Sequence, residues 1–436
     1  MIKKGEILLS EKPFVFVLKS SLLKQRCNHC FASSEVKKCS QCHYVSYCGK
    51  NCQRSAWALH KLECSKLAKT LPNILPDSAH LLIRLILKLK ISSNQDSNIC
   101  QNKYKAKNRP FSDLMSHYDE LLQDQRRMEH FRTLIMLLGI FFNDEENLDE
   151  DEILQLFGKM CINSFNILDN DMNSIGTGMY LAASILDHSC EPNAVAIFEG
   201  TTIYIRTIKN LKRFDWSNIR ISYIDVLNLT SHRKKELQSM YYFLCDCERC
   251  RDQEEGNLMN SMACPNKNCS GFVHVPENIS DKLSCAMCRS IVSKARIDKF
   301  QEITPLSDYH LQNMKSKDMA YIDVCEMTLK KQINVLHEYN VRRVKIMDLA
   351  FEACINLERW EDAFKYGRQL LPGFRKYYRN HHPLVGLLNM KLLKLALLQD
   401  DLFAAKSYYN EAKEILLVSH GSHHSLYASL QEVFCS

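Results

Sequence analysis

The sequence predicts an α+β multidomain fold that combines short β-strands, a metal-organised segment and a helical C-terminal region. Three observations support this prediction. Eight zinc-ligand residues crowd between positions 27 and 64, β-forming residues alternate with turn residues over 5–18 and 194–223, and helical periodicity covers 298–436. With 436 residues and 46% hydrophobic content, the chain is long enough to bury two or three cores.

The N-terminal metal ligands come in four spaced pairs. A zinc ion takes four soft ligands in a tetrahedron, and a Cys-x2-Cys turn presents two thiolates to one ion. Eight ligands therefore predict two closed structural sites, whereas eight thiols buried in an ordinary core would show no such spacing. The spacing alone leaves open which pairs share an ion. The pairs are Cys27-x2-Cys30, Cys39-x2-Cys42, Cys48-x3-Cys52 and His60-x3-Cys64.

Local patterns predict the secondary structure around this segment. Residues 5–18 are expected to form two short β-segments around a turn. Helical periodicity covers Ser78 to Ile91, and again roughly 111–142 and 151–160. The polar stretch from Ser92 to Pro110 is predicted to be a linker between these helices.

The pattern changes character at about Asn163. Ala194 to Arg206 predicts a β-hairpin, because a Glu-Gly turn is flanked by β-forming residues. Ile219 to Tyr223 predicts a further strand. Beyond Thr230 the pattern is helical and then rich in cysteine.

From about Asp298 onward the chain is predicted to be helical. The segments Asn356–Ala363 and Leu398–Ala405 look like successive helix-turn-helix units about 42 residues apart. A small alanine beside each turn lets paired helices pack closely. This arrangement is similar to tetratricopeptide-type (TPR) repeats, and the alternative is plain helical packing without a ligand groove.

Two further cysteine groups have metal-ligand spacing. Cys245-x-Cys247-x2-Cys250 supplies three thiolates. Cys264-x4-Cys269 and Cys285-x2-Cys288 together resemble the two knuckles of a zinc ribbon, against the alternative of incidental cysteine turns. The remaining cysteines are expected to be small buried hydrophobic residues. These are Cys100, Cys161, Cys325, Cys354 and Cys435.

Cysteine usage also bears on the cellular compartment. The chain has twenty cysteines and its N-terminus lacks the apolar stretch of an export signal. Reduced, metal-bound thiols are therefore expected, in the nucleus and the cytoplasm. The most apolar run, Ala79 to Ile91, holds three basic residues and is too short to cross a bilayer, so no membrane contact is expected.

Net charge gives a weaker indication of partners. The formal charge of +7 falls to about zero when fifteen cysteine thiolates and four zinc ions are counted. Residues 1–70 stay basic, with thirteen Lys and Arg against four Asp and Glu. This segment could contact DNA weakly or bind an acidic partner, and a solvated basic surface is the alternative.

Four motifs in the second half of the chain resemble the SET domain of protein lysine methyltransferases, and they occur in that family's order. The cysteine-rich segment 27–64 resembles the MYND zinc finger, a module that binds protein partners. With a helical C-terminal region after them, nearly the whole chain resembles the SMYD family. The motifs are Asn163-Ser164-Phe165, Ser184 to Asn193, Ile221-Ser222-Tyr223 and Tyr241 to Cys250.

The resemblance implies ligand sets that spacing does not supply. In the finger it implies interleaved ligation, with Cys27, Cys30, Cys48 and Cys52 on one ion and Cys39, Cys42, His60 and Cys64 on the other. It adds Cys190 as the fourth ligand beside Cys245, Cys247 and Cys250.

The resemblance also implies a methyl-transfer site that uses S-adenosylmethionine. Tyr223 would lie beside the transferring methyl group, and Tyr241, Phe243 and Phe165 would wall a lysine channel whose aromatic faces tolerate a cation. Contacts with the donor are implied for Asn163, Ser184, Asp187, His188, Tyr223 and Phe243.

The chain departs from the family pattern at three places. Asp187 stands where the family has asparagine, and Phe214 to Asn218 replaces a Gly-Glu-Glu-Leu turn. A Gly-x-Gly turn that would precede Met1 is absent from the sequence, which predicts either a truncated gene model or an incomplete donor site. The expected domains are an N-terminal SET part (1–26), MYND finger (27–64), helical insertion (65–160), SET core (161–226), post-SET segment (227–256), zinc-ribbon-like insertion (257–297) and helical TPR-like domain (298–436).

The sequence thus predicts a zinc-binding protein-lysine N-methyltransferase that acts on histones or other proteins. Partner proteins, including a chaperone, are expected at the finger and the TPR-like helices. The alternative function is that of a catalytically weak adaptor, in which the finger recruits a peptide and the SET core is a scaffold.

Overall fold

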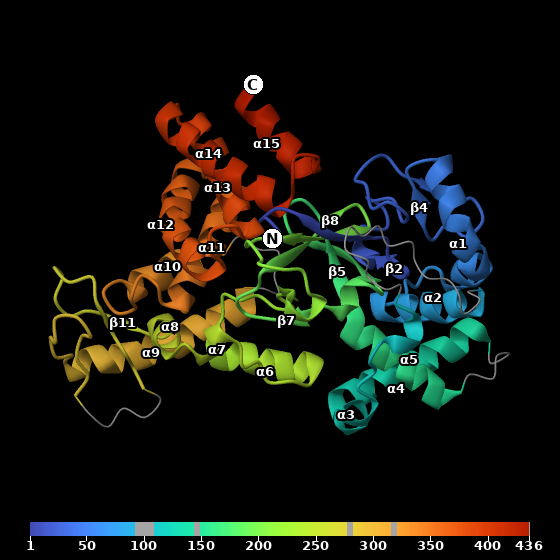
Figure 1. The fold of residues 1–436 in the computed structure, drawn as a ribbon, viewed down its shortest axis with the longest axis horizontal. Coiled ribbons are helices and arrows are strands. Elements are labelled where there is room, and N and C mark those ends of the chain that lie inside the picture. Colours follow the sequence, from blue (N-terminus) through green and yellow to red (C-terminus); the bar gives the residue numbers. More distant parts are fainter. Residues whose placement is uncertain (92–108, 144–148, 277–281, 315–320, 436) are drawn as a thin grey trace. The chain divides into compact units, whose positions relative to one another are not determined.

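The computed structural model describes residues 1–91, 109–143, 149–276, 282–314 and 321–435, so the predicted linker from Ser92 to Pro110 lies almost wholly outside the described residues (Figure 1). The chain divides into two compact units. The segment 161–226, predicted as one SET core, contributes to both. Unit 1 comprises Met1–Asp187, Asn193–Ile221 and Ser239–Tyr242, and unit 2 comprises His188–Pro192, Ser222–Gln238 and Phe243–Ser436.

Unit 1 contains two small antiparallel sheets. In one, β9 (Thr202–Thr207) lies between β1 (Ile7–Glu11) and β8 (Ala194–Glu199). In the other, β6 (Ser174–Met179) lies between β2 (Val15–Leu18) and β5 (Ser164–Leu168). The hairpin predicted over 194–206 is confirmed, and the two β-segments predicted within 5–18 are strands of different sheets.

The strand predicted from Ile219 to Tyr223 is shorter than expected. Only β10 (Arg220–Ile221) has strand geometry, and the two-residue strand β7 (Asp187–His188) crosses the boundary between the units. Just before β10, the Asp215 side chain accepts the Ser217 N–H at 3.0 Å and closes a tight turn. This Asx turn stands where the family has its glycine-containing turn.

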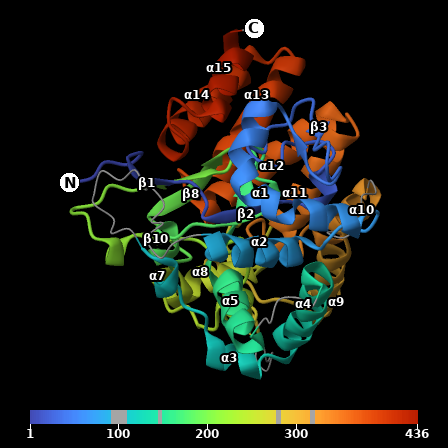
Figure 2. The same cartoon turned by 90° about the vertical axis from the view of Figure 1, so that its right-hand side faces the viewer.

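Helices surround these sheets in unit 1. The finger contributes α1 (Lys50–Thr70) together with the short strands β3 (Lys37–Lys38) and β4 (Ser46–Tyr47). The predicted helix from Ser78 to Ile91 is confirmed as α2 (Asp77–Ile91), whose residues 79–87 are all buried. It contacts β2, α4 (Gln125–Phe142) and α5 (Glu150–Asn163) (Figure 2).

The helical structure predicted roughly over 111–142 is confirmed for most of that range, but it is divided into three elements. These are a 3₁₀ turn (Phe111–Asp113), α3 (Tyr118–Gln123) and α4. The break lies at Asp124, whose backbone is extended and whose side chain accepts the Arg127 N–H as an N-cap. Aspartate favours a cap over a helix interior because its carboxylate satisfies the free amides of the next helix.

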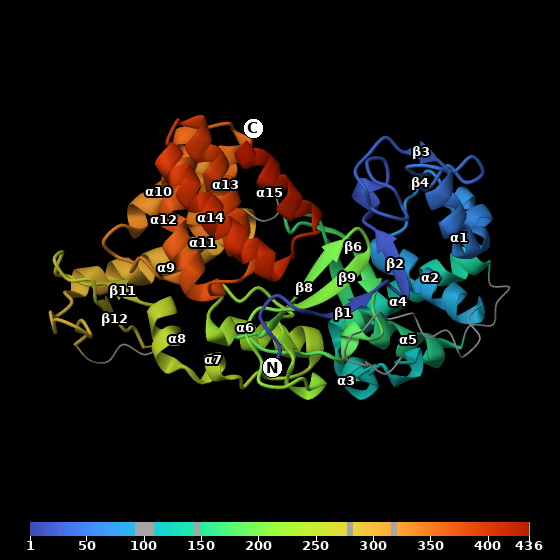
Figure 3. The same ribbon diagram turned by 45° about the horizontal axis from the view of Figure 1, so that its top comes forward.

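Unit 2 is mostly helical after the cysteine-rich segment (Figures 1 and 3). Its short elements are α6 (Thr230–Tyr241), most of which lies in this unit, α7 (Glu248–Arg251), α8 (Gln253–Met259), β11 (Met262–Ala263) and β12 (Phe272–Val273). The helices that follow are α9 (Lys294–Met314), α10 (Ile322–Gln332), α11 (Val341–Asn356), α12 (Trp360–Tyr378), α13 (Pro383–Leu398), α14 (Leu402–Ser419) and α15 (Ser425–Cys435).

The two predicted helix-turn-helix units are α11–α12 and α13–α14, and consecutive helices pack side by side. Ala363 and Ala405, each just beyond a turn, are 0% and 1% exposed. A Cβ on Gly367 would lie 2.7 Å from the Phe351 ring, so this glycine allows α12 to approach α11 closely. Among the described helices, none is long and apolar enough to span a bilayer.

Candidate functional site

The finger holds its ligands on two knuckles and one helix. Cys27 and Cys30 lie on the first knuckle, and α1 supplies Cys52 together with His60 and Cys64, which are one helical turn apart. The eight ligands form two groups, and within each group all ligand atoms lie within 4.8 Å of one another. The groups are the interleaved sets that the family resemblance implies. They are Cys27, Cys30, Cys48, Cys52 and Cys39, Cys42, His60, Cys64.

Glu63 orients the histidine ligand of the second group. Its Oε1 lies 3.0 Å from His60 Nδ1, which turns Nε2 toward Cys42 Sγ at 3.7 Å. Glu63 is 0% exposed and also contacts His80 and Arg84 on α2, at 3.0 Å and 2.7 Å. A carboxylate behind a histidine ligand fixes the ring tautomer and its direction, which is a common support for zinc.

A third group joins two distant segments of unit 2. Cys190 lies beside Cys245, Cys247 and Cys250, with 3.6 Å between Cys190 Sγ and Cys250 Sγ. The buried guanidinium of Arg233 lies 3.9 Å from Cys250 Sγ. Four thiolates around a divalent ion carry net negative charge, and this cation offsets it.

A fourth group belongs to the insertion at 257–297. Cys264 and Cys269 flank the turn between β11 and β12, and Cys285 and Cys288 complete the set. The Gly271 N–H lies 3.3 Å from Cys269 Sγ, and a Cβ on Gly271 would come within 2.8 Å of Cys285 Sγ. A side chain at position 271 would therefore clash with a ligand sulfur, so this glycine lets the backbone pass close to the group.

Sulfur spacing tests whether zinc fits. Six sulfur–sulfur distances within the four groups lie between 3.4 and 3.9 Å, and all ligand atoms of a group lie within 4.8 Å of one another. With Zn–S bonds of about 2.3 Å, the edge of a tetrahedron is about 3.8 Å. Disulfides would require about 2.05 Å. The donor sets therefore fit four zinc ions.

The other cysteines are only partly described. Cys325 and Cys354 are both 0% exposed, as expected for small hydrophobic residues. Cys161 is half-buried, and burial raises the pKa of its thiol to about 11. Cys100 and the side chain of Cys435 lie outside the described residues.

Three of the predicted site residues meet in unit 2. The His188 ring lies 5.3 Å from the Tyr223 ring and 6.1 Å from the Phe243 ring, and the Tyr223 and Phe243 rings cross edge to face at 6.5 Å. His188 precedes the ligand Cys190 by two residues, and Phe243 precedes the ligand Cys245 by two. The third cysteine group thus holds both ends of an aromatic cluster, defined here as His188, Tyr223 and Phe243.

His188 is neutral and occupied on both nitrogens. Its Nδ1 accepts the backbone N–H of Tyr223 at 3.0 Å, which places the ring proton on Nε2, 3.2 Å from Cys190 Sγ. Burial lowers the pKa of His188 to about 4, and the charged form is absent at neutral pH. Contact with a donor would therefore use the ring face or the main chain.

The remaining predicted residues belong to unit 1. Asn163 Nδ2 donates to Met115 O at 2.9 Å and to Lys159 O at 2.8 Å. Ser184 Oγ donates to Tyr180 O at 2.6 Å. Phe165 on β5 packs edge to face on Tyr180, with ring centroids 5.7 Å apart.

Asp187 is exposed, and a cation balances it. Its Oδ2 lies 3.5 Å from Arg220, and its side chain is 71% exposed. Tyr241 also lies in unit 1, in the short segment Ser239–Tyr242. The next residue, Tyr242, holds that segment: its hydroxyl donates to Asp124 at 3.1 Å, and Arg127 lies 5.0 Å from its ring centroid.

Sequence reasoning did not identify several supporting residues. Glu11, 1% exposed on β1, accepts the N–H groups of Ala182 and Ala183 at 3.0 Å and so holds the turn that carries Ser184. Desolvation raises the pKa of Glu11, and these backbone hydrogen bonds oppose that effect. For Glu63, the spacing His60-x2-Glu63 was an available signal, because residues three apart lie on one face of a helix such as α1.

Comparisons with known proteins agree with this arrangement. Residues 27–64 match the family model of the MYND finger. The chain is 29% identical to "Histone-lysine N-methyltransferase ASHR1" of Arabidopsis thaliana, over 96% of this chain and 88% of that protein. It is 28% identical to human "Histone-lysine N-methyltransferase SMYD3" and 25% identical to human "N-lysine methyltransferase SMYD2". Both alignments cover 98% of this chain, and they cover 91% and 92% of those proteins.

Proposed function

We propose that this chain, which its MYND finger and its near-full-length relatives identify as a member of the SMYD family, is a protein-lysine N-methyltransferase that uses S-adenosylmethionine. The names of the relatives support methyl transfer to lysine. The observation that carries the proposal is the aromatic cluster, with Tyr223 bonded to a neutral His188 beside four thiols.

The side chains of Asn163, Asp187 and His188 are chemically suited to bind S-adenosylmethionine. When bound, S-adenosylmethionine supplies an electrophilic methyl group on a positively charged sulfur. Asn163 Oδ1 and the Asp187 carboxylate are acceptors and would hold the ammonium group of the donor. The neutral imidazole of His188 adds no positive charge near a cationic ligand.

The protein would contribute to methyl transfer by orienting the substrate amine. Tyr223 and Phe243 would present aromatic surface to the substrate amine. Roles for Phe165 and Tyr241 in the lysine channel rest on the family resemblance alone. Methyl transfer needs the amine in line with the methyl group, so alignment supplies most of the acceleration. No carboxylate pair is required if water takes the amine proton.

Donor binding and turnover test this proposal. Calorimetric titration with S-adenosylmethionine should give a saturable heat, and radiolabelled methyl groups should appear on histone lysines. Tyr223→Phe should lower turnover at least tenfold and leave donor affinity within about twofold, because only the orienting hydroxyl is lost. Tyr309→Phe, at a residue 62% exposed on α9, is the control. Absence of binding heat at high micromolar S-adenosylmethionine would refute the proposed enzymatic function.

The adaptor function is the second candidate, and an exposed apolar surface favours partner binding. The turn between α13 and α14 exposes Leu398, Leu402 and Phe403 at 63%, 70% and 89%. Large exposed apolar side chains at one place commonly mark interaction surfaces. Partner proteins, a chaperone among them, would bind these helices or the finger, and the basic charge of the finger also permits weak DNA contact. Phe403→Ser should weaken partner capture without changing donor binding.

We also propose residence in both the nucleus and the cytoplasm. Sixteen clustered metal ligands need a reducing compartment, and both compartments supply one. Imaging of a fluorescent fusion would test this, and confinement to a secretory compartment would refute it.

A further inference from the structure

The two loops that carry His188 and Tyr223 are both hydrogen-bonded to the C-terminal end of α12. Tyr378 donates its hydroxyl to Asp225 Oδ1 at 2.7 Å, two residues after Tyr223. The next residue, Arg379, donates its Nε to Glu191 Oε2 at 3.0 Å, three residues after His188. Two consecutive residues, Tyr378 and Arg379, thus anchor the two loops that carry Tyr223 and His188.

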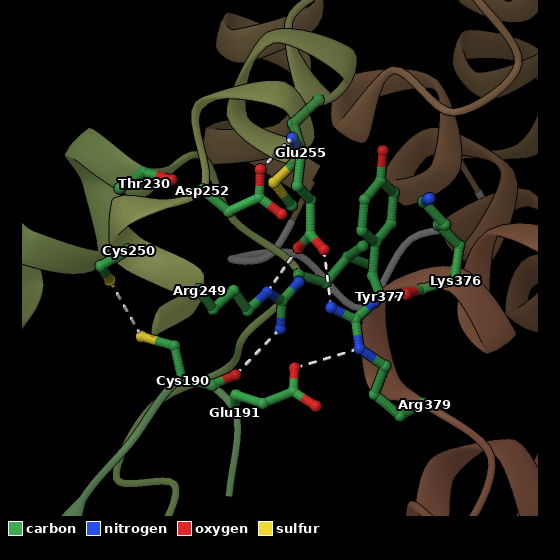
Figure 4. A network of polar contacts seen from close by, with 12 residues as sticks. Cys190, Glu191, Thr230, Arg249, Cys250, Asp252, Glu255, Lys376, Tyr377 and Arg379 are labelled. Atoms are coloured by element: carbon green, nitrogen blue, oxygen red, sulfur yellow. Dashed lines mark hydrogen bonds and ion pairs between the residues drawn. The ribbon is translucent and has the colours of Figure 1, made fainter. Parts of the chain in front are cut away.

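A ring of charged side chains extends the second anchor (Figure 4). Arg379 Nη2 pairs with Glu255 Oε2 at 2.7 Å, and Glu255 Oε1 pairs with Arg249 Nε at 2.5 Å. Arg249 Nη1 then donates to the backbone oxygen of Cys190 at 3.1 Å. Because Cys190 and Glu191 are adjacent, the ring closes on the loop where it began.

This ring is neutral, and one of its two ion-paired halves is buried. Two guanidinium groups face two carboxylates. The side chains of Arg249 and Glu255 are 2% and 7% exposed, whereas those of Arg379 and Glu191 at the outer side of the ring are 37% and 22% exposed. Arg249 also lies between the ligands Cys247 and Cys250. The buried pair of Arg249 and Glu255 and the half-exposed pairs of Arg379 together connect the metal loop to the end of α12.

The backbone at Arg379 is consistent with this anchoring role. Its φ is 69°, in the left-handed region that non-glycine residues rarely adopt. Such a conformation persists only where surrounding contacts hold it. The contacts here are the two ion pairs of Arg379 and the stacking of Tyr378 on His382, with ring centroids 4.7 Å apart.

We infer that Tyr378 and Arg379 are positioning residues for Tyr223 and His188, so that the end of α12 belongs to the methyl-transfer site. The inference rests on the proposed function. Tyr378 fixes the chain beyond Tyr223, Arg379 fixes the chain beyond His188, and the bond from the Tyr223 N–H to His188 Nδ1 joins the two loops. Release of either anchor lets the Tyr223 hydroxyl move relative to the substrate amine.

Neighbouring residues on α12 provide matched controls for a kinetic test. Tyr377 donates its hydroxyl to Tyr339 O, and Arg375 pairs with Glu411, and neither partner lies on the two loops. Tyr378→Phe and Arg379→Met should each lower kcat about tenfold, with KM for S-adenosylmethionine within about twofold. Tyr377→Phe and Arg375→Met should stay within twofold in both constants. Arg379→Lys, which keeps the charge, should recover part of the loss.

A second measurement separates this inference from the proposed function. With 3-fluorotyrosine incorporated only at Tyr223, the wild type should give one sharp fluorine resonance. Tyr378→Phe and Arg379→Met should broaden or split it, and the two control variants should not. An unchanged resonance, or equal kinetic losses in all four variants, would overturn the inference. Absence of methyl transfer by the wild type would overturn the proposed function. The fluorine spectra of the variants would still show whether α12 anchors Tyr223.

Discussion

Replacing Glu63 by glutamine is expected to destabilise the finger and loosen one of its two metal centres. Glu63 is 0% exposed and accepts hydrogen bonds from three side chains: His60 on α1, and His80 and Arg84 on α2. Glutamine keeps the shape of the side chain but loses its charge. One carboxylate oxygen becomes an amide NH2 group, which cannot accept a hydrogen bond from the surrounding donors.

The size of the effect follows from the burial of both partners. The Arg84 side chain is 6% exposed, so the variant leaves a buried guanidinium without its counter-charge. Breaking such a pair costs about 3–5 kcal/mol, a large part of the roughly 5–15 kcal/mol that stabilises a domain. For a unit of this size, the melting temperature should fall by about 10 °C. Zinc affinity at the centre that contains His60 should fall by about 10- to 100-fold.

Thermal unfolding and zinc transfer to a chromophoric chelator would measure both effects. In the variant, one zinc equivalent should become labile while the centre formed by Cys27, Cys30, Cys48 and Cys52 keeps its slow release. Glu35→Gln, at an exposed glutamate of the same finger, is the control and should change neither property. Equal stability of the Glu63 variant and the wild type, or equal loosening of both centres, would refute the reasoning.

Three further predictions concern charge and metal content. Asp187→Asn should weaken S-adenosylmethionine binding about threefold to fivefold, because one exposed carboxylate contributes up to about 1 kcal/mol of attraction toward the donor's ammonium group; calorimetry would show it, and an unchanged affinity would place Asp187 outside the donor site. Asp348→Asn should raise the melting temperature by about 2–4 °C at pH 8 and by less at pH 5. Burial, with a contribution from the Glu352 carboxylate, raises the pKa of Asp348 to about 7, so its favourable contribution present at low pH is lost as pH rises through that value; a gain independent of pH would contradict this. Cys285→Ser should reduce bound zinc from four equivalents to three by elemental analysis, and a wild type with three equivalents would remove the fourth centre.

Several features of the fold were predictable because they depend on neighbours in the sequence. The β8–β9 hairpin follows from turn residues between β-forming residues, and α2 follows from its apolar run. Paired cysteines predict a metal site from the sequence because a zinc knuckle is formed by residues close together in the chain. The helical content predicted roughly over 111–142 is largely confirmed, but the break at the capping residue Asp124 was not predicted, because the periodic pattern continues across it.

Aromatic residues of the candidate site could be placed in the sequence only through the order of family motifs. Tyrosine and phenylalanine on short strands carry no local signal that separates a core residue from a catalytic one. The structure shows that His188, Tyr223 and Phe243 meet, and that both nitrogens of His188 are engaged. The direction of the imidazole is therefore a property of the fold.

The sequence by itself determined the kinds of ligand, the positions of the knuckles and most of the helices, because these follow from spacing and periodicity within a few turns of chain. Only the tertiary structure decided which distant charges meet. Glu63 and Arg84 are 21 residues apart, and Arg379 and Glu191 are 188 apart. Such pairs form where long-range packing excludes water and brings opposite charges into contact, and no local pattern records that geometry.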